Sequence, residues 1–346
     1  MIDIIIPNWN GKKLLEICLA SLAKQDCKDF TITVVDNGSS DDSLGFLENC
    51  YPEIQVISFS ENRGFSVAVN EGIKATENPW VFLLNNDIEV ENDCITQLKK
   101  ACINNRKYDF FALKMIDYYH RDKIDGAGDA VLRAGVGYRI GTMELDCRRY
   151  AIQRDVFGAC AGAALYKRSM FDKIGCFDED FFAYLEDVDF SIRAVRAGNR
   201  CCYLPDVRVY HMGSASSGSR INAFIVSHST RNNIFIILKN YYLELFLRFL
   251  PSIIVYQVLW FLFVVKYRHV LAYAKGFFQG LKCFRKMIRR GIHDRKMNGR
   301  IPESVFGNMI IESEKQALFS IMRRRKQLGK SNLLFDAYLR IFIGKN

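Results

Sequence analysis

Two clusters of polar side chains follow apolar runs in the first ninety residues, and their chemistry suits a nucleotide ligand. The run FLL (82–84) is followed by Asn85, Asn86 and Asp87. Hard divalent cations prefer oxygen ligands, and a bound diphosphate would supply most of them, so Asp87 with an amide such as Asn85 forms a minimal metal site. Asp36 follows the run TITVV and could accept a hydrogen bond from a nucleobase N–H or a ribose hydroxyl. An ordinary polar turn after a strand is the alternative for both clusters.

The segment ENRGFSVAVNEG (61–72) could line the pocket for such a ligand. Gly64 allows backbone to approach a ligand closely, because it lacks a Cβ. Arg63 could pair with a phosphate, and Asn70 lies on the helix that the apolar spacing predicts next. The alternative is a helix that begins at a glycine for purely structural reasons.

A third cluster is acidic and lies much later, where Glu186, Asp187 and Asp189 begin a helical pattern. One of these carboxylates could act as a general base toward an acceptor hydroxyl. The structural alternative is that all three are stabilised by the positive end of the helix dipole. His211 ends the strand-like run DVRVYH. It is neutral enough near pH 7 to bind a metal ion, although a single histidine is more often structural.

Alternating strands and helices must position these side chains. Apolar, β-rich runs predict strands at 2–6, 31–35, 54–58 and 80–84, and helical spacing predicts helices at 12–24 and 64–75. This alternation predicts an α/β fold with a mostly parallel sheet covered by helices on both faces. Ligands of such sheets bind at the carboxyl ends of the strands, where the polar clusters stand.

The sequence pattern of strands and helices is less regular in the rest of the chain. The segment 105–160 is interrupted by Gly126, Gly128, Gly135, Gly137 and Gly141, and we expect it to form loops and short strands near a substrate cleft. A helix at 187–197, a strand at 200–210 and helices from 223 onward are predicted after it.

Composition separates two regions of different charge. The formal net charge is +10, but residues 266–346 carry 19 Lys and Arg against 5 Asp and Glu, so the first 265 residues are mildly acidic. This asymmetry predicts a catalytic domain at 1–222 and a basic, apolar helical module at 223–346. The acidic body argues against nucleic acid as a partner.

Cysteine usage and missing motifs narrow the class of protein. The 11 cysteines form no C-x-x-C pair and no zinc spacing, which indicates reduced thiols in the cytosol. The first residues, IDIII, begin a strand and do not resemble a signal peptide. Neither G-x-G-x-x-G nor a Walker A sequence occurs, so no bound redox cofactor is expected.

The apolar stretch 249–265 has three interpretations. Its 17 residues, with Pro251 and Gln257 inside, are at the lower limit for a spanning helix. The favoured interpretation is an interfacial helix on anionic lipid, helped by the basic runs at 282–290 and 322–326. A helix buried against the catalytic domain or in a homo-oligomer, and a true membrane span, are the alternatives.

In order and spacing the chain resembles family 2 glycosyltransferases of the GT-A fold, in particular their rhamnosyltransferase-like bacterial branch. The resemblance covers about two-thirds of the chain and rests on these stretches: IDIIIPNWNG, VVDNGSSDDS, NRGFSVAVNEG, FLLNNDIEV, GACAGAALYKRSMFDKIGCFDEDFFAYLEDVDFSIRAVRAG and VYHMGSAS. It is specific for the type of reaction and weakly specific for the sugar.

The resemblance implies a role for each donor-side residue. Pro7, Asn8 and Asp36 would contact the nucleotide, and Arg63, Gly64 and Asn70 would line the donor pocket. Asn85, Asn86 and Asp87 are similar to the family's D-x-D element, with Asp87 as the metal ligand. This chain departs from that element at Asn85, so metal binding would depend more on Asp87, on His211 and on the diphosphate. The ion would be Mg²⁺ or Mn²⁺.

For the chemical step, the resemblance implies that Glu186 and Asp187 match the family's catalytic pair, with Asp187 as the base. The expected reaction is hexosyl transfer with inversion from a dTDP- or UDP-linked sugar, which could be rhamnose. The acceptor would be a polyprenyl-linked saccharide in surface polysaccharide or cell-wall glycan synthesis, with the protein peripheral on the cytoplasmic face of the membrane. A non-catalytic nucleotide-sugar-binding scaffold and a sugar nucleotidyltransferase are the alternatives. The segment PNWNGKK lacks the glycine-rich phosphate loop that the nucleotidyltransferase requires.

Overall fold

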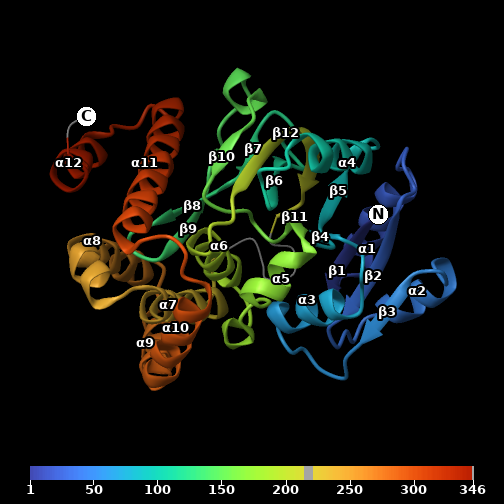
Figure 1. Cartoon of the computed structure of the whole chain (residues 1–346), viewed down its shortest axis with the longest axis horizontal. Coiled ribbons are helices and arrows are strands. Elements are labelled where there is room, and N and C mark those ends of the chain that lie inside the picture. Colours follow the sequence, from blue (N-terminus) through green and yellow to red (C-terminus); the bar gives the residue numbers. More distant parts are fainter. Residues whose placement is uncertain (214–220, 345–346) are drawn as a thin grey trace.

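A central mixed sheet organises the chain, whose computed structural model describes residues 1–213 and 221–344 (Figure 1). In the described ranges the strand order is β10-β12-β6-β11-β4-β1-β2-β3, with β5 paired to β12 and β7 to β6. These strands are β1 (Ile2–Asn8), β2 (Phe30–Asp36), β3 (Gln55–Ser58), β4 (Trp80–Leu84), β5 (Ile88–Val90), β6 (Phe110–Asp117), β7 (Ile124–Ala127), β10 (Arg154–Val156), β11 (Ala163–Lys167) and β12 (Cys201–His211).

The strands that carry the predicted nucleotide residues run parallel. β1 pairs in parallel with β2 and with β4, and β2 pairs in parallel with β3. β11 lies antiparallel between β4 and β6, so the sheet is mixed beyond β4. Asn8 lies opposite Asp36 in the β1–β2 register. The polar ends of two strands therefore meet at one edge of the sheet.

Helices cover both faces of the sheet because alternate residues of its strands point to opposite sides. Ile4 and Ile6 of β1 pack with α1 (Lys12–Ala23), α2 (Ser43–Cys50) and α4 (Cys94–Asn104). Ile5 packs on the other face with α3 (Phe65–Lys74), α5 (Arg168–Ile174) and α6 (Glu186–Arg196). The α/β fold with helices on both faces is thereby confirmed.

The prediction for 105–160 was wrong in one important respect. The segment Phe110–Asp117 forms β6, a buried strand between β12 and β11. Lys114 interrupts the apolar pattern of this strand, and its buried ammonium group pairs with Asp146 at 2.6 Å. The remainder of the segment does contain short elements, including a hairpin of β8 (Asp129–Leu132) and β9 (Val136–Arg139).

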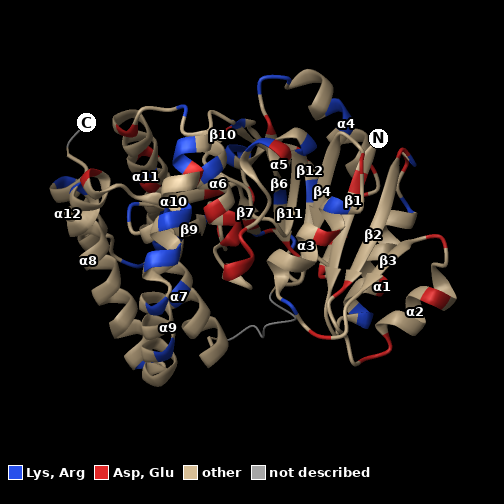
Figure 2. Cartoon of the chain, turned by 60° about the horizontal axis from the view of Figure 1, so that its bottom comes forward, with Lys and Arg blue, Asp and Glu red and all other residues tan. Residues whose placement is uncertain are grey.

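The region after residue 222 is helical, as predicted. Its helices are α7 (Ala223–Asn240), α8 (Leu243–Lys266), α9 (Val270–Lys282), α10 (Phe284–Asn298), α11 (Glu303–Gln327) and α12 (Leu333–Phe342). Of these, α7, α8, α10 and α11 share a third apolar core with the sheet domain, in which Phe235, Phe249 and Phe306 pack beside Phe181 and Ile192. Figure 2 shows basic stretches of α10 beside acidic stretches of the sheet domain.

The helix α8 is longer than the predicted apolar stretch. It is the one described helix whose length and composition would suffice to cross a membrane, and 22% of its most apolar window is buried inside the protein. One face packs inward through Leu245, Phe249 and Ile253.

Candidate active site

A cavity of about 1010 Å³ opens at the carboxyl ends of β1 and β4. Of the predicted residues, those that line it are Pro7, Asn8, Gly64, Asn85, Asn86, Asp87, Glu186, Asp187 and His211. The fold therefore brings most of the predicted site into one space. Asp36, Arg63 and Asn70 are not among the lining residues.

Two asparagines build the floor of the cavity. Asn86 Nδ2 donates to Asn8 Oδ1 at 2.7 Å, and Asn8 Nδ2 donates to Asp36 Oδ2 at 2.9 Å. Gly11 packs directly against these amides, and a Cβ there would collide with Asn86. Asp36 is fully buried, and it also accepts hydrogen bonds from the backbone and hydroxyl of Ser39. Asp36 therefore holds Asn8 in place and does not itself face the cavity.

The segment around Arg63 and Gly64 contributes backbone groups to the site. Gly64 begins α3 with a φ of 90°, a conformation that side chains other than glycine rarely adopt. Arg63 is exposed and its guanidinium lies 4.9 Å from the centre of the Phe59 ring. Asn37, which the sequence analysis did not single out, lines the cavity and accepts a hydrogen bond from the Arg63 N–H at 2.8 Å.

Asn70 has a different environment from the one that the sequence suggested. Its side chain donates to the carbonyl oxygen of Phe177 at 2.9 Å and accepts from the N–H of the same residue at 3.0 Å. It also donates to Glu179 at 3.1 Å. These bonds join α3 to the segment that precedes Glu186.

Asp87 and His211 face each other in the cavity. His211 Nε2 lies 3.4 Å from Asp87 Oδ2, and His211 Nδ1 lies 2.8 Å from Asp125 Oδ2. Arg139 pairs with the same Oδ2 atom of Asp125. Burial alone would lower the pKa of His211, but hydrogen bonds to Asp125 and Asp87 outweigh it and raise the pKa to about 9.

The same pair has the features of a metal site. Asp87 is 5% exposed, and its Oδ1 has no hydrogen-bond partner among the described residues. A carboxylate that holds the far nitrogen of a metal-binding histidine fixes the ring's orientation, as Asp125 does here. The two donors therefore fit a hard divalent cation that takes its remaining ligands from a diphosphate.

The acidic pair at the start of α6 lies in the same cavity. Burial, followed by the charge of Asp187, raises the pKa of Glu186 to about 8. Burial also raises the pKa of Asp187, although the N–H groups of Ala161 and Val188 donate to it at 3.4 and 2.8 Å. A raised pKa makes a carboxylate a stronger base near neutral pH.

A third carboxylate, Asp129, was missed by the sequence analysis. It begins β8, lines the cavity, and has a pKa raised to about 7 by burial and by Asp187. Ligand atoms of Asp129, Asp187 and Cys160 lie within 4.8 Å of one another. The glycine-rich stretch GAGDAV offered no signal for it, because only tertiary packing brings it to Asp187.

The backbone just before Glu186 is strained. Phe182, Tyr184 and Leu185 have φ values of 63°, 70° and 66°, in the left-handed region. Asn232 of α7 stabilises this segment, because its Nδ2 donates to the carbonyl oxygens of Phe181, Ala183 and Tyr184 at 2.7–2.9 Å. The C-terminal helices thereby set the position of the acidic pair.

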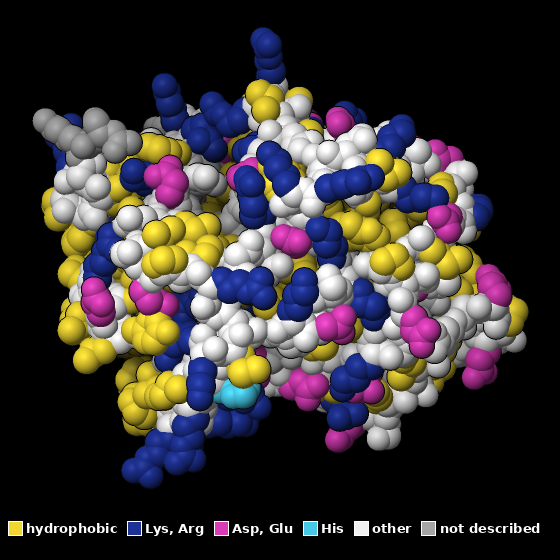
Figure 3. Space-filling model, viewed as in Figure 1, with side chains coloured by type: hydrophobic (Ala, Val, Ile, Leu, Met, Phe, Trp, Pro, Cys, Tyr) yellow, Lys and Arg dark blue, Asp and Glu magenta, His cyan; other side chains and the backbone are white. Residues whose placement is uncertain are grey.

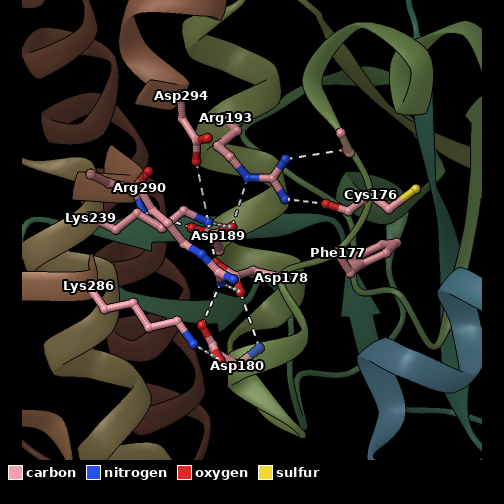
Figure 4. A network of polar contacts seen from close by, with 12 residues as sticks. Cys176, Phe177, Asp178, Asp180, Asp189, Arg193, Lys239, Lys286, Arg290 and Asp294 are labelled. Atoms are coloured by element: carbon pink, nitrogen blue, oxygen red, sulfur yellow. Dashed lines mark hydrogen bonds and ion pairs between the residues drawn. The ribbon is translucent and has the colours of Figure 1, made fainter. Parts of the chain in front are cut away.

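A buried ionic network fixes α6 itself to the same helices (Figure 4). Lys239 of α7 pairs with Asp178 at 2.7 Å and with Asp189 at 2.8 Å. Arg290 of α10 pairs with Asp178 and Asp180. Because Asp189 stands two residues after Asp187, this network holds the helix that presents the acidic pair to the cavity.

Comparison with known proteins identifies the family. The sequence profile described as Glycosyl transferase family 2 matches residues 3–175, half of the chain. The chain belongs to this family. It is therefore a glycosyltransferase, and the expected family and fold are confirmed.

Several proteins that are named as glycosyltransferases are similar in sequence to this chain. The N-acetylglucosaminyl-diphospho-decaprenol L-rhamnosyltransferase of Mycobacterium tuberculosis (strain H37Rv) is 25% identical over 263 residues, covering 68% of this chain and 84% of the relative. Rhamnosyltransferase WbbL of Escherichia coli K12 is 28% identical over 228 residues, covering 61% and 83%. A PGL/p-HBAD biosynthesis glycosyltransferase of Mycobacterium bovis BCG is 27% identical over 197 residues, covering 56% and 69%.

Solved structures support the fold of this family member. Staphylococcus aureus TarS 1–349 in complex with UDP-GlcNAc aligns with a TM-score of 0.54 and 19% identity, covering 95% of this chain and 92% of TarS. GalNAc-T7 with UDP, GalNAc and Mn²⁺ aligns with a TM-score of 0.58 and 15% identity, covering 87% and 58%. At these identities the similarity concerns the fold alone.

Proposed function

We propose that this glycosyltransferase moves a sugar from a nucleotide-diphosphate donor to an acceptor hydroxyl with inversion at the anomeric carbon. The observation that carries the proposal is a single cavity that contains both a metal-type pair, Asp87 and His211, and a buried carboxylate, Asp187. The pair of Asp87 and His211 suits a metal-bound diphosphate, and the carboxylate of Asp187 suits an acceptor hydroxyl that must lose its proton.

The donor would lie across the ends of β1 and β4. Pro7 and Asn8 would contact the nucleotide, with Asp36 acting through its hydrogen bond to Asn8. Asn85, Asn86 and the backbone at Gly64 would complete the pocket. Arg63 is exposed at its edge, where its guanidinium could reach a phosphate, and Asn70 would support the wall through Phe177.

Asp87 and His211 would hold a divalent ion, Mg²⁺ or Mn²⁺. Such an ion acts as a Lewis acid toward a diphosphate when it is bound. His211 must donate no proton toward the ion, so the expectation that it is neutral near pH 7 does not hold before the ion binds, and the ion would have to displace the Nε2 proton that the raised pKa retains. Asp125, which contacts its other nitrogen, would keep the proton on Nδ1.

Asp187 would act as the general base, with Glu186 orienting the acceptor or Asp187 itself. The acceptor oxygen bonds to the anomeric carbon while Asp187 takes its proton, and the nucleoside diphosphate leaves with the electrons of the broken bond. Attack and departure on opposite faces of the sugar invert the anomeric centre. The transition state has oxocarbenium character, as in other glycosyl transfers.

The names of the relatives support the class of substrate. Two relatives are rhamnosyltransferases, and one acts on a decaprenol-linked N-acetylglucosamine diphosphate. We therefore propose rhamnose, carried by dTDP or UDP, as the donor sugar and a polyprenyl-linked saccharide as the acceptor. The product would enter a surface polysaccharide or cell-wall glycan, made by a peripheral protein at the cytoplasmic face of the membrane.

A thermal-shift screen tests the donor site. The full chain is heated with dTDP-rhamnose, UDP-GlcNAc and related nucleotide sugars, with and without Mg²⁺ or Mn²⁺. A ligand at about 100 times its Kd stabilises the folded state by roughly 2.7 kcal/mol. Stabilisation that requires the metal and disappears in Asp87→Ala supports the proposal. Stabilisation by no nucleotide sugar would overturn it.

A non-catalytic nucleotide-sugar-binding scaffold is the second candidate. Asn85 favours it, because an amide replaces the first acid of the family's metal-binding element. Metal-dependent donor binding without release of nucleoside diphosphate, in the presence of polyprenyl-linked acceptors, would support the scaffold.

A further inference from the structure

The end of the α8–α9 hairpin exposes a concentrated apolar surface. We call residues 258–271 the apolar end. Its exposed members are Val258, Leu259, Phe261, Leu262, Phe263, Val265, Tyr267, Val270 and Leu271. Leu259, Leu262 and Leu271 are 61%, 57% and 88% exposed. Figure 3 shows hydrophobic side chains gathered on the left of the molecule, over α8 and α9. Contiguous apolar surface of this kind indicates an interaction site.

The protein's own packing does not use this surface. The inward face of α8 is already occupied, through Leu245, Phe249 and Ile253 in the third core. At the apolar end, Val264 is buried, and Trp260 Nε1 donates to Thr230 Oγ1 of α7 at 2.9 Å. Phe261 and Phe263 also pack on the rings of Tyr273 and Trp260, whereas Leu259, Leu262 and Leu271 are more than half exposed and lie outside the third core, so these leucines are available to an outside partner.

Charge indicates the chemistry of that partner. No Asp or Glu occurs between Glu244 and Asp294. Lys266, Arg268 and Lys275 are exposed and form no ion pair among the described residues. An apolar surface with unpaired cations beside it complements an anionic lipid bilayer.

Other basic residues of the module have internal partners. Lys286 and Arg290 of α10 pair with Asp178 and Asp180, and Arg323 of α11 pairs with Glu144. These ion pairs occupy Lys286, Arg290 and Arg323, so these three residues of the basic runs 282–290 and 322–326 are less available to anionic lipid. Lys282, Arg285 and Arg289 of the run 282–290 are exposed and form no ion pair among the described residues, so they remain available to an anionic surface together with the cations of the apolar end.

The apolar end lies close to the mouth of the active-site cavity. Gly276 of α9 packs against the backbone of Ser227, leaving no room for a Cβ, so α9 starts beside the first turns of α7. Ala223 and Phe224 in those turns line the cavity. Phe224 stacks at 4.1 Å from the ring of His228, whose pKa is lowered by burial and by the nearby charges of Arg231 and Lys275.

We propose that residues 258–271 insert into the surface of an anionic bilayer and thereby hold the cavity mouth, at Phe224, close to the lipid headgroups. This inference rests on the proposed function, because a lipid-linked acceptor would then enter the cavity directly from the membrane. The acceptor's saccharide would reach Asp187 while its lipid stays in the bilayer.

Vesicle flotation of the full chain tests the proposal. The vesicles contain phosphatidylcholine alone or phosphatidylcholine mixed with phosphatidylglycerol. The wild-type chain should float with the anionic vesicles, and binding should weaken as salt rises from ~0.1 M to ~1 M, because screening shortens from about 10 to about 3 Å. Failure to float with anionic vesicles at low salt would overturn the proposal.

Two pairs of substitutions locate the contact. Lys266→Glu with Lys275→Glu should lower partitioning at least ~25-fold, since each cation near an anionic surface is worth about fivefold. Leu262→Glu with Leu271→Glu should lower it at least ~100-fold, since each buried leucine is worth roughly tenfold or more. The matched controls are Lys100→Glu and Ile103→Glu on α4, both exposed and on the sheet domain. Equal partitioning of the four variants would overturn the proposal.

Two further measurements separate the possible failures. Light scattering in solution reports whether the leucine variants change the oligomeric state. A variant that turns a dimer into a monomer while still floating would assign the surface to a second copy of this chain and overturn the proposal. Metal-dependent stabilisation by nucleotide sugars is measured on the same variants. If neither the wild type nor any variant is stabilised by nucleotide sugars, the proposed function is contradicted. If the variants that no longer float are still stabilised, the apolar end has a purely membrane-binding role.

Discussion

At the scale of single residues, the site depends on carboxylates that the fold removes from water. Asp187, Glu186 and Asp129 lie in one cavity, and burial raises the pKa of each. Buried like charges cannot all ionise near neutral pH, so the protonation of one depends on the others.

The first residue-scale prediction concerns the base. Asp187→Asn should lower turnover by ~10²-fold or more, because an amide cannot accept the acceptor's proton. Nucleotide-diphosphate affinity should stay nearly unchanged, as Asp187 does not contact the donor in the proposed arrangement. Glu186→Gln is expected to cost less. Steady-state kinetics and calorimetric titration of the nucleotide check this, and wild-type turnover in Asp187→Asn would remove the residue from the mechanism.

The second concerns Asp129, whose ionisation is opposed by the charge of Asp187, so that by reciprocity a charge on Asp129 opposes the ionisation of Asp187. Asp129→Asn removes that charge, so the pKa of Asp187 should fall and the acid limb of the kcat/KM profile should move to lower pH. Cys160→Ser is the matched control, because Cys160 lies in the same cluster and burial raises the pKa of its thiol. Superimposable profiles for wild type and Asp129→Asn would show that the two carboxylates do not interact.

At the scale of elements, much of the site was predictable because each parallel strand ends in a polar cluster. The carboxyl ends of β1 and β4 brought Asn8, Asn86 and Asp87 together as expected. Local pattern could not reveal Asp125 and Asp129, which stand in a glycine-rich stretch and act only through contacts with His211 and Asp187.

The sequence also could not show which polar side chains face the ligand and which brace the walls. Asp36 and Asn70 belong to the motifs, but their polar atoms are used within the protein. The sequence could not show such a role in the C-terminal helices either, because Asn232 acts through three backbone carbonyls that are distant in sequence.

An element-scale prediction follows from Asn232. Asn232→Ala removes the amide that donates to the carbonyls of Ala183 and Tyr184, and loss of the hydrogen bond to a buried acceptor costs about 1–3 kcal/mol. The carbonyl of Phe181 keeps its bond from Arg231. The strained segment should relax, lowering both Tm and kcat while nucleotide affinity is retained. Asn233→Ala, which loses bonds to Ala134 and Gly135 instead, is the control. If both variants lose the same kcat, Asn232 has no specific positioning role.

At the scale of the whole molecule, ion pairs join the helical module to the sheet domain. Asp178 and Asp189 are largely buried with Lys239, and the pKa of each carboxyl is lowered, against the effect of burial, chiefly by that ammonium group. Because their folded-state pKa values lie below the usual 3.8, the unfolded chain binds more protons at low pH.

The corresponding prediction is a loss of stability in acid. This network should contribute its full share of the free energy of unfolding above about pH 5. That free energy should fall as the pH drops below about 4. Lys239→Met should cost roughly 3–5 kcal/mol near neutral pH, since it leaves buried carboxylates uncompensated. The acid-dependent loss of stability should also be smaller in Lys239→Met than in the wild type, because the folded-state pKa values of Asp178 and Asp189 are then no longer lowered by the ammonium group. Thermal unfolding between about pH 3 and 7 measures both effects, and identical pH profiles in the two proteins would contradict the assignment.

The helix α7 contacts both of the regions for which we have proposed a function. Through Ser227 and Thr230 it contacts α9 and Trp260 of the apolar end, and through Asn232 it holds the segment that precedes Glu186. A displacement of the apolar end at the lipid surface would therefore be transmitted along α7 to Glu186 and Asp187. The enzyme is therefore expected to show interfacial activation, with turnover on a water-soluble acceptor analogue rising when anionic vesicles are added.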